Sequence, residues 1–267
     1  RGVAVGSAAG CNSHGVAQYV TAALCALHRR GSLDLRGLTV GVVGVGNVGS
    51  KVASYSETLG MKVLLCDPPR AAAEGPEGFV PLEELLGGSD IVTVHVPYDS
   101  STHNMICGKF ISAMKPGAVL VNSSRGGVMD PDAVAGARLC GRIGSLVVDT
   151  WPGEPDIPEG LLSAADIATP HIAGYSFQGK QNASAAVVRA FAEHFGISDL
   201  KDFMPLPDGH SLRFVTIGDD MDENVAAVLD LYDIEADSRA LKSAPAEFEH
   251  LRNSYVYRDE IRLRRIL

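Results

Sequence analysis

The chain has 267 residues, 46% of them hydrophobic, and a formal net charge of −9 at pH 7. This length accommodates one large domain or two smaller ones, and the hydrophobic content is sufficient for a buried core. The acidic charge is interspersed with Lys and Arg, which supports solubility and argues against nucleic-acid binding, so an anionic substrate requires local positive charge. No apolar run approaches the roughly 20 residues that span a bilayer, so we expect no membrane partner.

Cysteine usage bears on the cellular compartment. The five cysteines are scattered, odd in number and without a C-x-x-C pair. This pattern favours a reducing compartment over a disulfide framework and gives no support for metal ligation. The N-terminus also lacks the basic-then-apolar pattern of a signal peptide. We therefore expect a cytoplasmic protein without a metal site.

The first element in chain order is a helix, which runs from a cap at Asn12 or Ser13 to a stop at Gly31. Residues 38–60 then lead from an apolar strand through glycines into an amphipathic helix. Residues 61–69 supply the next apolar strand. These segments predict one β-α-β unit.

Short apolar strands and helices continue to alternate up to residue 171. The further predicted strands are residues 90–97, 117–124, 144–151 and 165–171, and the helices between them are residues 81–88 and 131–140. Strands that are apolar on both faces and alternate with helices imply a parallel sheet covered on both sides. We therefore predict an α/β fold with a doubly wound, Rossmann-like parallel sheet.

A long helix that leaves the sheet is predicted over residues 176–196. A proline-rich linker at residues 202–210 follows it, and strand-like residues 212–217 with later charged stretches mark a change of composition. We therefore predict two domains: residues 1–195 form the doubly wound domain, and residues 196–267 form a small α+β domain.

A glycine-rich turn follows the first strand of the β-α-β unit and fits the dinucleotide-binding pattern G-x-G-x-x-G. The candidate cofactor-binding residues of this turn are Gly44, Gly46, Asn47, Val48 and Gly49. Gly44 permits the tight turn, Gly46 admits a pyrophosphate to the backbone amides, and Gly49 allows close helix packing. The helix N-terminus favours the negative charge of the ligand. The turn therefore predicts a dinucleotide site, although an ordinary glycine-rich turn has the same local pattern.

Asp67 ends the next strand, and its position bears on the choice between NAD and NADP. A carboxylate there can bind both ribose hydroxyls and repels a 2′-phosphate, which predicts NAD as the cofactor. Arg70 lies three residues later and weakens this preference, because its guanidinium can reach a 2′-phosphate.

Three polar residues follow strands in the second half of the predicted sheet: Arg125, Glu154 and His171. The carboxyl ends of parallel strands meet at one edge, where ligands bind, so these side chains can converge. Arg125 can hold a carboxylate through two hydrogen bonds, and Glu154 beside His171 would stabilise an imidazolium. His171 would then take the proton of a hydroxyl while a hydride leaves the same carbon. The set predicts oxidation of a 2-hydroxy acid, although each residue alone also fits a solvated loop or a turn hydrogen bond.

Five segments, in this order, resemble the D-isomer-specific 2-hydroxyacid dehydrogenases: VGVVGVGNVGSKV, LCDPPR, LVNSSRGGVMD, VVDTWPGEPD and TPHIAGYSFQGK. The NAD-binding domain of that family corresponds to about residues 1–195. The resemblance implies active-site roles for Arg125 and Glu154, and it implies that His171 is the proton donor or acceptor. It also implies contacts with NAD by Asp67, Val96, Asp149 and Gly174, and with substrate by Tyr175.

Two of these positions carry an alternative or a departure from the family pattern. Val96 stands where the family often has threonine, and because a valine side chain donates no hydrogen bond, only backbone contact with NAD is expected there. Asp149 ends a strand, where its carboxylate either faces the nicotinamide amide or caps a turn. The replacement of NACRG by NSSRG keeps small residues before Arg125 and is expected to leave it in place.

The chain opens without an initiator methionine, in what reads as a strand and turn. In the family, an upstream segment builds most of the substrate domain and supplies hydroxyl residues that hold the substrate. Nothing in this sequence corresponds to that segment. We therefore expect a chain that lacks the N-terminal part of the substrate domain, with a complete NAD site and an open substrate site.

The segments GCN, CDPPR and HIAGY resemble one branch of the family, which acts on a phosphorylated hydroxy acid. PAEFEHLRNSYVYRDEIR resembles the end of that branch's C-terminal dimerisation domain, which implies a homodimer formed through residues 196–267. Arg252, Tyr255 and Arg258 lie at helical spacing and are candidates for binding the phosphate, although a solvated charged helix face is the alternative. A different D-2-hydroxyacid dehydrogenase and a non-catalytic NAD-binding module are the alternative functions.

Overall fold

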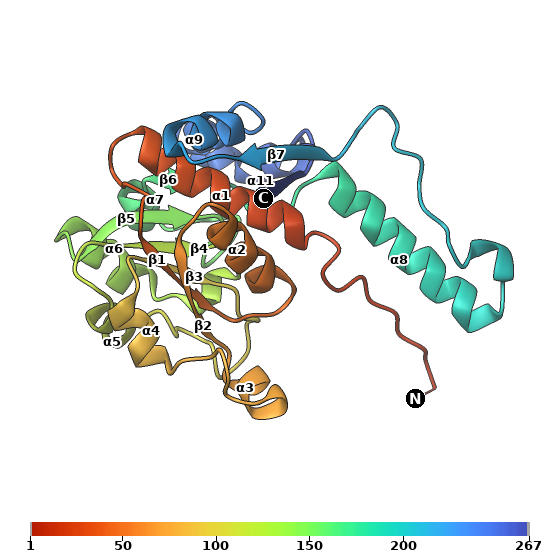
Figure 1. Ribbon diagram of the computed structural model, residues 1–267, viewed down its shortest axis with the longest axis horizontal. Helices are drawn as coiled ribbons and strands as arrows, with labels where there is room; N and C mark the ends of the chain where they lie inside the picture. The colour runs from red at the N-terminus through yellow and green to blue at the C-terminus, as the bar shows by residue number, and fades with distance from the viewer. Residues whose placement is uncertain (1, 266–267) are drawn as a thin grey trace.

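A computed structural model describes residues 2–265, and its centre is a six-stranded parallel sheet (Figure 1). The strands are β1 (Thr39–Val43), β2 (Lys62–Cys66), β3 (Ile91–Val94), β4 (Ala118–Asn122), β5 (Ile143–Val148) and β6 (Ile167–Ala168). They are arranged in the order β2-β1-β3-β4-β5-β6, and all neighbouring pairs are parallel. The predicted α/β fold with a doubly wound parallel sheet is confirmed.

Helices connect these strands and continue beyond them. The α-helices are α1 (Ser13–Arg29), α2 (Asn47–Thr58), α3 (Pro68–Glu74), α4 (Leu82–Gly88), α5 (Gly108–Ala113), α6 (Pro131–Leu139), α7 (Glu159–Ala164), α8 (Phe177–Phe195), α9 (Met221–Leu229), α10 (Ile234–Ser243) and α11 (Phe248–Asn253). Short 3₁₀ turns lie at Gly126–Val128, Ser198–Leu200 and Pro245–Glu247. Within residues 2–265, no helix is both long and apolar enough to cross a membrane.

The predicted strand over residues 61–69 is too long, because it ends at Cys66 and a helix follows at once. Asp67 caps this helix by accepting a hydrogen bond from the N–H of Arg70, and proline occupies the first helical positions. Proline suits the first turn of a helix, where its missing N–H is not needed. The acidic residue at the end of β2 is therefore held in a defined place.

Successive side chains of the strands point to opposite faces of the sheet and form two hydrophobic clusters. Val40 and Val42 of β1 pack in one cluster with α1 and α2. Val92 and Val94 of β3 pack in the other cluster with α4, α5, α6 and α7. Burial on both faces explains why the strands read as nearly continuous apolar runs.

The C-terminal strands pack onto the first of these clusters. β7 (Arg213–Ile217) and β8 (Ile261–Arg265) form a parallel pair, and Val215, Ile217 and Ile261 are buried in the cluster that contains α1. These strands therefore share a core with α1, whereas Leu241 and Phe248 of the same region are buried in the second cluster. The predicted domain boundary after residue 195 falls at the end of α8, and the assignment of residues 196–267 to a dimerisation domain stays a prediction.

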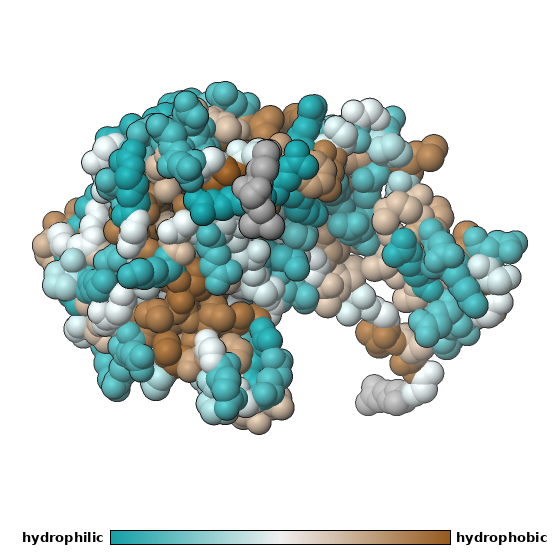
Figure 2. Space-filling view, in the orientation of Figure 1, coloured by the Kyte–Doolittle hydropathy of each residue, from teal (hydrophilic) through white to brown (hydrophobic). Residues whose placement is uncertain are grey.

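Helix α8 and the segment that precedes α1 extend away from the sheet, to the right in Figure 1. Ser176 caps α8 by accepting a hydrogen bond from the N–H of Gly179, and Gly196 ends the helix in the left-handed conformation. These are the two ends predicted from the sequence. Figure 2 shows open space between this projecting part and the body of the molecule.

Candidate active site

The candidate site lies at the carboxyl edge of the sheet, where the strand order changes direction. The chain runs from β1 to β2 on one side of β1 and then crosses back to β3 on its other side, so the loops after β1 and β3 separate at this point. Ligands of open α/β sheets bind in the crevice formed there. The glycine-rich turn and the three predicted polar residues all follow strands at this edge.

The glycine-rich turn has the close approaches that require glycine. Gly44 has φ +85°, and a Cβ there would lie 2.8 Å from the carbonyl of His95. A Cβ on Gly49 would lie 2.0 Å from the carbonyl oxygen of Gly44. A Cβ on Gly46 would meet nothing within 4 Å, so that position faces open space beside the turn. Side chains at Gly44 and Gly49 would clash with the protein's own backbone. At Gly46 the backbone has room for a side chain, so there the glycine matters only for the close approach of a ligand.

The N-terminus of α2 faces the space above this turn. Gly46 and Asn47 are exposed, Val48 is half-buried, and no side chain caps the first N–H groups of the helix. Unpaired N–H groups and the helix dipole favour a phosphate at such an end. These residues therefore fit the pyrophosphate of a dinucleotide.

Asp67 is half-buried at the end of β2, beside the same turn. Its Oδ2 accepts a hydrogen bond from the N–H of Val45 at 2.7 Å. The guanidinium of Arg70 binds the carbonyl of Val45 at 2.6 Å and the carboxylate of Glu74 at 2.6 and 2.8 Å. Arg70 is thus held by its own neighbours, which favours recognition of a ribose by Asp67 over recognition of a 2′-phosphate.

The residues after β3 close the other side of the cleft. The side chain of Val96 lies 3.0 Å from the place of a Cβ on Gly44, next to the cofactor turn. His95 is hydrogen-bonded to the Thr93 hydroxyl at 2.9 Å, and burial lowers the pKa of His95 to about 3. His95 is therefore neutral at physiological pH and lines the cleft without adding charge.

The structure brings Glu154 and His171 into direct contact. Glu154 Oε2 lies 2.8 Å from Nδ1 of His171, and Oε1 accepts a hydrogen bond from the N–H of Trp151 at 2.7 Å. Burial by itself favours the neutral acid, but the bonds from His171 and Trp151 outweigh it and hold the pKa of Glu154 below its ordinary value. Glu154 is therefore a carboxylate at neutral pH, Nδ1 of His171 donates to it, and Nε2 is left as the other ring nitrogen.

Arg125 follows β4 on the same edge and is exposed. Its Nη1 donates to the carbonyl of Ser124 at 2.7 Å. The next residue, Gly126, packs directly against Trp151, because a Cβ on Gly126 would lie 2.0 Å from the Trp151 carbonyl. Arg125 thus stands beside the segment that binds Glu154, with its guanidinium accessible to a ligand.

Asp149 is buried, and both of its oxygens are engaged within the protein. They accept hydrogen bonds from the Thr169 hydroxyl at 2.7 Å and from the N–H groups of Ile172 at 2.8 Å and Ala173 at 3.0 Å. Burial raises the pKa of Asp149, while His171 and these bonds act in the opposite direction. Of the two alternatives weighed from sequence, the turn-capping role is the one with visible contacts, and contact of Asp149 with NAD stays a prediction.

Gly174 and Tyr175 continue the loop after His171. A Cβ on Gly174 would lie 2.3 Å from the side-chain nitrogen of Asn12, so the loop approaches the start of α1 closely. The Tyr175 hydroxyl accepts a hydrogen bond from Nε of Arg252 at 3.1 Å, and Nη1 of Arg252 lies 3.9 Å from Glu154. Arg252 therefore brings a positive charge from the C-terminal region to the site.

The helical spacing predicted for Arg252, Tyr255 and Arg258 is wrong, because α11 ends at Asn253 and the following residues form a bridge to Ser176. Arg252 reaches the site, whereas Arg258 is buried behind the His171 loop. Sequence reasoning also missed the Trp151 N–H and the Thr169 hydroxyl. In the sequence, these residues are marked only by lying a few positions before Glu154 and His171, and nearness along the chain does not predict a contact.

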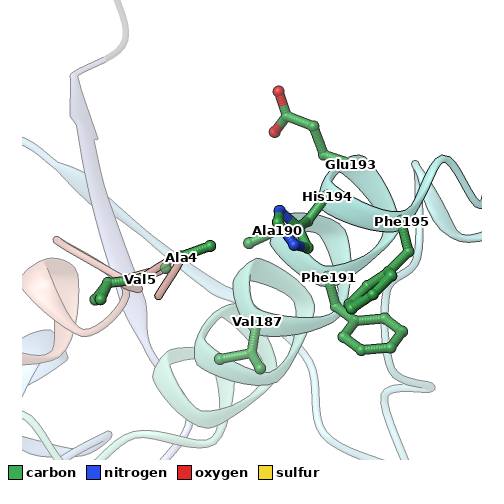
Figure 3. A pocket seen from close by; sticks show the side chains of 9 residues that line it. Ala4, Val5, Val187, Ala190, Phe191, Glu193, His194 and Phe195 are labelled. Atoms are coloured by element: carbon green, nitrogen blue, oxygen red, sulfur yellow. The ribbon is translucent and has the colours of Figure 1, made fainter. Parts of the chain in front are cut away.

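A hollow with a volume of about 640 Å³ lies elsewhere on the molecule. Figure 3 shows Ala4 and Val5 of the N-terminal segment on one side of it and a row of α8 side chains on the other. Among the latter, Phe191 and Phe195 give the hollow an apolar wall. The hollow does not include the glycine-rich turn, Glu154 or His171, so it is not the candidate active site.

Comparison with known proteins agrees with this geometry. The family model "D-isomer specific 2-hydroxyacid dehydrogenase, NAD binding domain" matches residues 14–173. An erythronate-4-phosphate dehydrogenase from Yersinia pestis (strain Pestoides F) is 37% identical over 272 residues, which cover 97% of this chain and 72% of the relative. One from Yersinia pseudotuberculosis serotype O:1b has the same identity and coverage.

Solved structures share the fold at lower identity. The TT0316 protein from Thermus thermophilus is 30% identical with a TM-score of 0.60, and the match covers 73% of this chain and 70% of that one. A D-lactate dehydrogenase from Aquifex aeolicus, solved with NAD and lactic acid, is 29% identical with a TM-score of 0.59. The match covers 74% of this chain and 70% of that one.

The sheet, the glycine-rich turn and the cleft beside it define a dinucleotide-dependent oxidoreductase, and NAD is its cofactor. More particularly, the chain belongs to the D-isomer-specific 2-hydroxyacid dehydrogenase family and is an NAD-dependent dehydrogenase of hydroxy acids.

Proposed function

We propose that this protein oxidises 4-phospho-D-erythronate to 2-oxo-3-hydroxy-4-phosphobutanoate, in the cytoplasmic synthesis of pyridoxal 5′-phosphate. The names of the 37%-identical relatives support the choice of substrate. The observation that carries the chemistry is the 2.8 Å contact between Glu154 and His171 at the carboxyl edge of the sheet.

His171 is proposed as the acid–base group. Glu154 accepts the hydrogen of Nδ1, so Nε2 of the neutral ring carries a free electron pair that can take the proton of the substrate 2-hydroxyl. Glu154 then faces the imidazolium that forms and stabilises its charge. In the reverse direction, His171 returns this proton to the carbonyl oxygen of the 2-oxo acid.

When bound, NAD would supply the acceptor for the hydride from C2 of the substrate, and His171 would take the hydroxyl proton, so both hydrogens of the alcohol are accounted for. Gly44 to Gly49 and Asp67 are the residues proposed to hold NAD, together with Val96, Asp149 and Gly174.

Arg125 and Tyr175 are proposed to orient the substrate. The exposed guanidinium of Arg125 can bind the substrate carboxylate through two parallel hydrogen bonds and polarise the carbonyl oxygen next to it. Tyr175 presents a hydroxyl that Arg252 already contacts. Arg252 supplies the local positive charge that an anionic substrate requires in a chain of net charge −9.

A comparison of substrates tests the proposal. We expect kcat/KM for 4-phospho-D-erythronate to exceed that for D-3-phosphoglycerate and D-lactate by at least about 100-fold, since polar groups left unpaired by the wrong substrate discriminate strongly. Higher kcat/KM for either competitor would assign a different substrate, and NAD binding without turnover of any of the three would support the non-catalytic alternative.

The homodimer is proposed on the resemblance of the C-terminal residues to a dimerisation domain. Sedimentation equilibrium of this chain at micromolar concentration measures it directly. We expect twice the chain mass of 28.1 kDa, and a monomer at these concentrations would refute the proposal.

A further inference from the structure

The loop that carries His171 has a backbone conformation that needs external support. His171 has φ +59°, which is the left-handed region and is uncommon for a residue with a side chain. Such a conformation is unfavourable for a residue with a side chain and persists only where the surroundings hold it. The groups that contact the next residues of the loop therefore determine where the imidazole lies.

The two residues directly after His171 are held through both their N–H and their carbonyl groups. The N–H groups of Ile172 and Ala173 donate to the buried carboxylate of Asp149 at 2.8 and 3.0 Å. The carbonyl oxygens of the same two residues accept hydrogen bonds from the guanidinium of Arg258, at 3.1 Å for Ile172. Asp149 precedes the loop in sequence, whereas Arg258 follows it and lies near the C-terminus.

Arg258 is set firmly in this position. Its side chain is buried; it also donates to the carbonyls of Tyr175 at 3.1 Å and Gly15 at 3.0 Å. Its guanidinium lies 4.4 Å from the centre of the Tyr232 ring, a cation–π contact. Because an arginine side chain stays protonated in proteins, these carbonyls face a permanent positive charge.

The backbone around Arg258 binds the same loop. The carbonyl of Arg258 accepts from the N–H of Phe177 at 2.9 Å, and Arg258 pairs with Ser176 in a parallel bridge. Two residues later, the buried carboxylate of Glu260 accepts a hydrogen bond from the Ser176 hydroxyl at 2.7 Å. Residues 258–260, here called the C-terminal strap, therefore lie along the end of the His171 loop.

We propose that Arg258 is a positioning residue for the proton transfer: with Asp149 it holds Ile172 and Ala173 from opposite sides and so places His171 beside Glu154. The inference rests on the proposed role of His171 as the acid–base group. It makes the C-terminal strap a part of the catalytic apparatus although Arg258 touches neither the imidazole nor Glu154 in the contacts described. A lysine cannot replace it, because an ammonium has three donors and no planar fork to reach several carbonyls at once.

The test is Arg258→Lys, which keeps the charge and removes the fork. Amide hydrogen exchange of Ile172 and Ala173, followed by NMR, reports on the loop without any substrate. We expect these two amides to exchange at least about tenfold faster, with the amides of α6, which Arg258 does not contact, unchanged. We also expect kcat for the hydroxy acid to fall at least about tenfold with an unchanged Kd for NAD, since misplacement of about 1 Å is costly in catalysis.

Arg264→Lys is the matched control. Arg264 lies 5.3 Å from the ring centre of Phe214 and is exposed, so this change should leave exchange, kcat and Kd for NAD at their wild-type values. If Arg258→Lys does not fold, Tyr255→Phe removes one hydroxyl that contacts Arg258 at 3.2 Å, and we expect a smaller, roughly threefold rise in exchange at the same two amides.

Three results would overturn the proposal: unchanged exchange at Ile172 and Ala173, equal acceleration throughout the sheet, or faster exchange with an unchanged kcat. The first two show that Arg258 does not hold the loop, and the third shows that the loop position does not matter for turnover. The exchange result stands even if the substrate is a different hydroxy acid, so a failure of this proposal can be told from a failure of the proposed function.

Discussion

The glycine-rich turn and the His171 loop lie at the same sheet edge but are built in different ways. The turn is made by six consecutive residues, 44–49, which run from the end of β1 into the first turn of α2, and its partner Asp67 directly follows the next strand. The His171 loop depends on contacts between residues 17, 23 and 86 positions apart, which join His171 to Glu154, Ile172 to Asp149, and Ile172 to Arg258.

This difference determines how each region responds to change. Close backbone approaches between neighbours shape the turn, so mainly substitutions within it should affect NAD binding. The loop is held by Asp149 and Glu154 from the segment after β5 and by the C-terminal strap, so changes far from His171 in sequence should affect proton transfer. Independent measurements of turnover and of NAD binding therefore distinguish the two regions.

The largest effect is expected for His171→Asn. Asparagine accepts the left-handed conformation at φ +59° but does not act as a base, so the fold should survive while kcat falls by about 10³-fold. Steady-state turnover and NAD titration by fluorescence measure the two quantities. An unchanged kcat would remove His171 from its proposed role, and a loss of NAD binding would show that the two regions are not separate.

Glu154→Gln should lower kcat by about 100-fold with little change in Kd for NAD. The amide carries no charge to face the imidazolium, and its nitrogen donates where the carboxylate accepts from Nδ1. Equal kcat in the variant and the wild type would contradict the assignment.

Glu154→Gln should also change how the free energy of unfolding depends on pH. Because the pKa of Glu154 is lower in the folded protein than its ordinary 4.5, its ionisation stabilises the fold above that pH, and this contribution is lost as the pH falls through the folded value. The free energy of unfolding of the wild type should therefore drop further than that of Glu154→Gln between pH 5 and the acid limit, as measured by urea titration. Parallel curves would refute the cause given for this pKa.

Gly46→Ala and Gly49→Ala form a matched pair in the cofactor turn. A Cβ on Gly49 would lie 2.0 Å from a carbonyl oxygen, so this change should lower the free energy of unfolding by about 2 kcal/mol. Gly46 has φ −77° and open space around it, so its change should leave stability intact and raise Kd for NAD about tenfold. An unchanged Kd for NAD in Gly46→Ala would show that the pyrophosphate does not bind at this turn.

The smallest effect is expected for Glu74→Ala, which releases the guanidinium of Arg70. Arg70 can then turn towards a 2′-phosphate, and kcat/KM with NADP should rise about threefold while that with NAD stays constant. The ratio of the two values measures the cofactor preference. A fall in kcat/KM with NADP would show that Glu74 does not keep Arg70 from binding a 2′-phosphate.

Much of the fold was predictable because its causes are local. The doubly wound sheet follows from apolar strands that alternate with helices, and α8 begins at Ser176 and ends at Gly196 because those residues cap it. The strand predicted up to residue 69 was too long because Asp67 and the prolines start α3. The pattern of apolar residues that predicts a strand contains no information about a helix cap. Helical spacing wrongly placed Tyr255 and Arg258 beside Arg252, since α11 ends before them.

The sequence by itself determined that a glycine-rich turn follows β1, that an acid ends β2 and that Arg125, Glu154 and His171 follow strands of one sheet. These features depend on periodicity, caps and backbone conformation, which act over a few residues. Only the tertiary structure decided that Glu154 lies 2.8 Å from His171, that Arg252 reaches Tyr175 and that Arg258 turns away to hold the loop from behind. Long side chains have many rotamers, and packing against elements far apart in the chain selects among them.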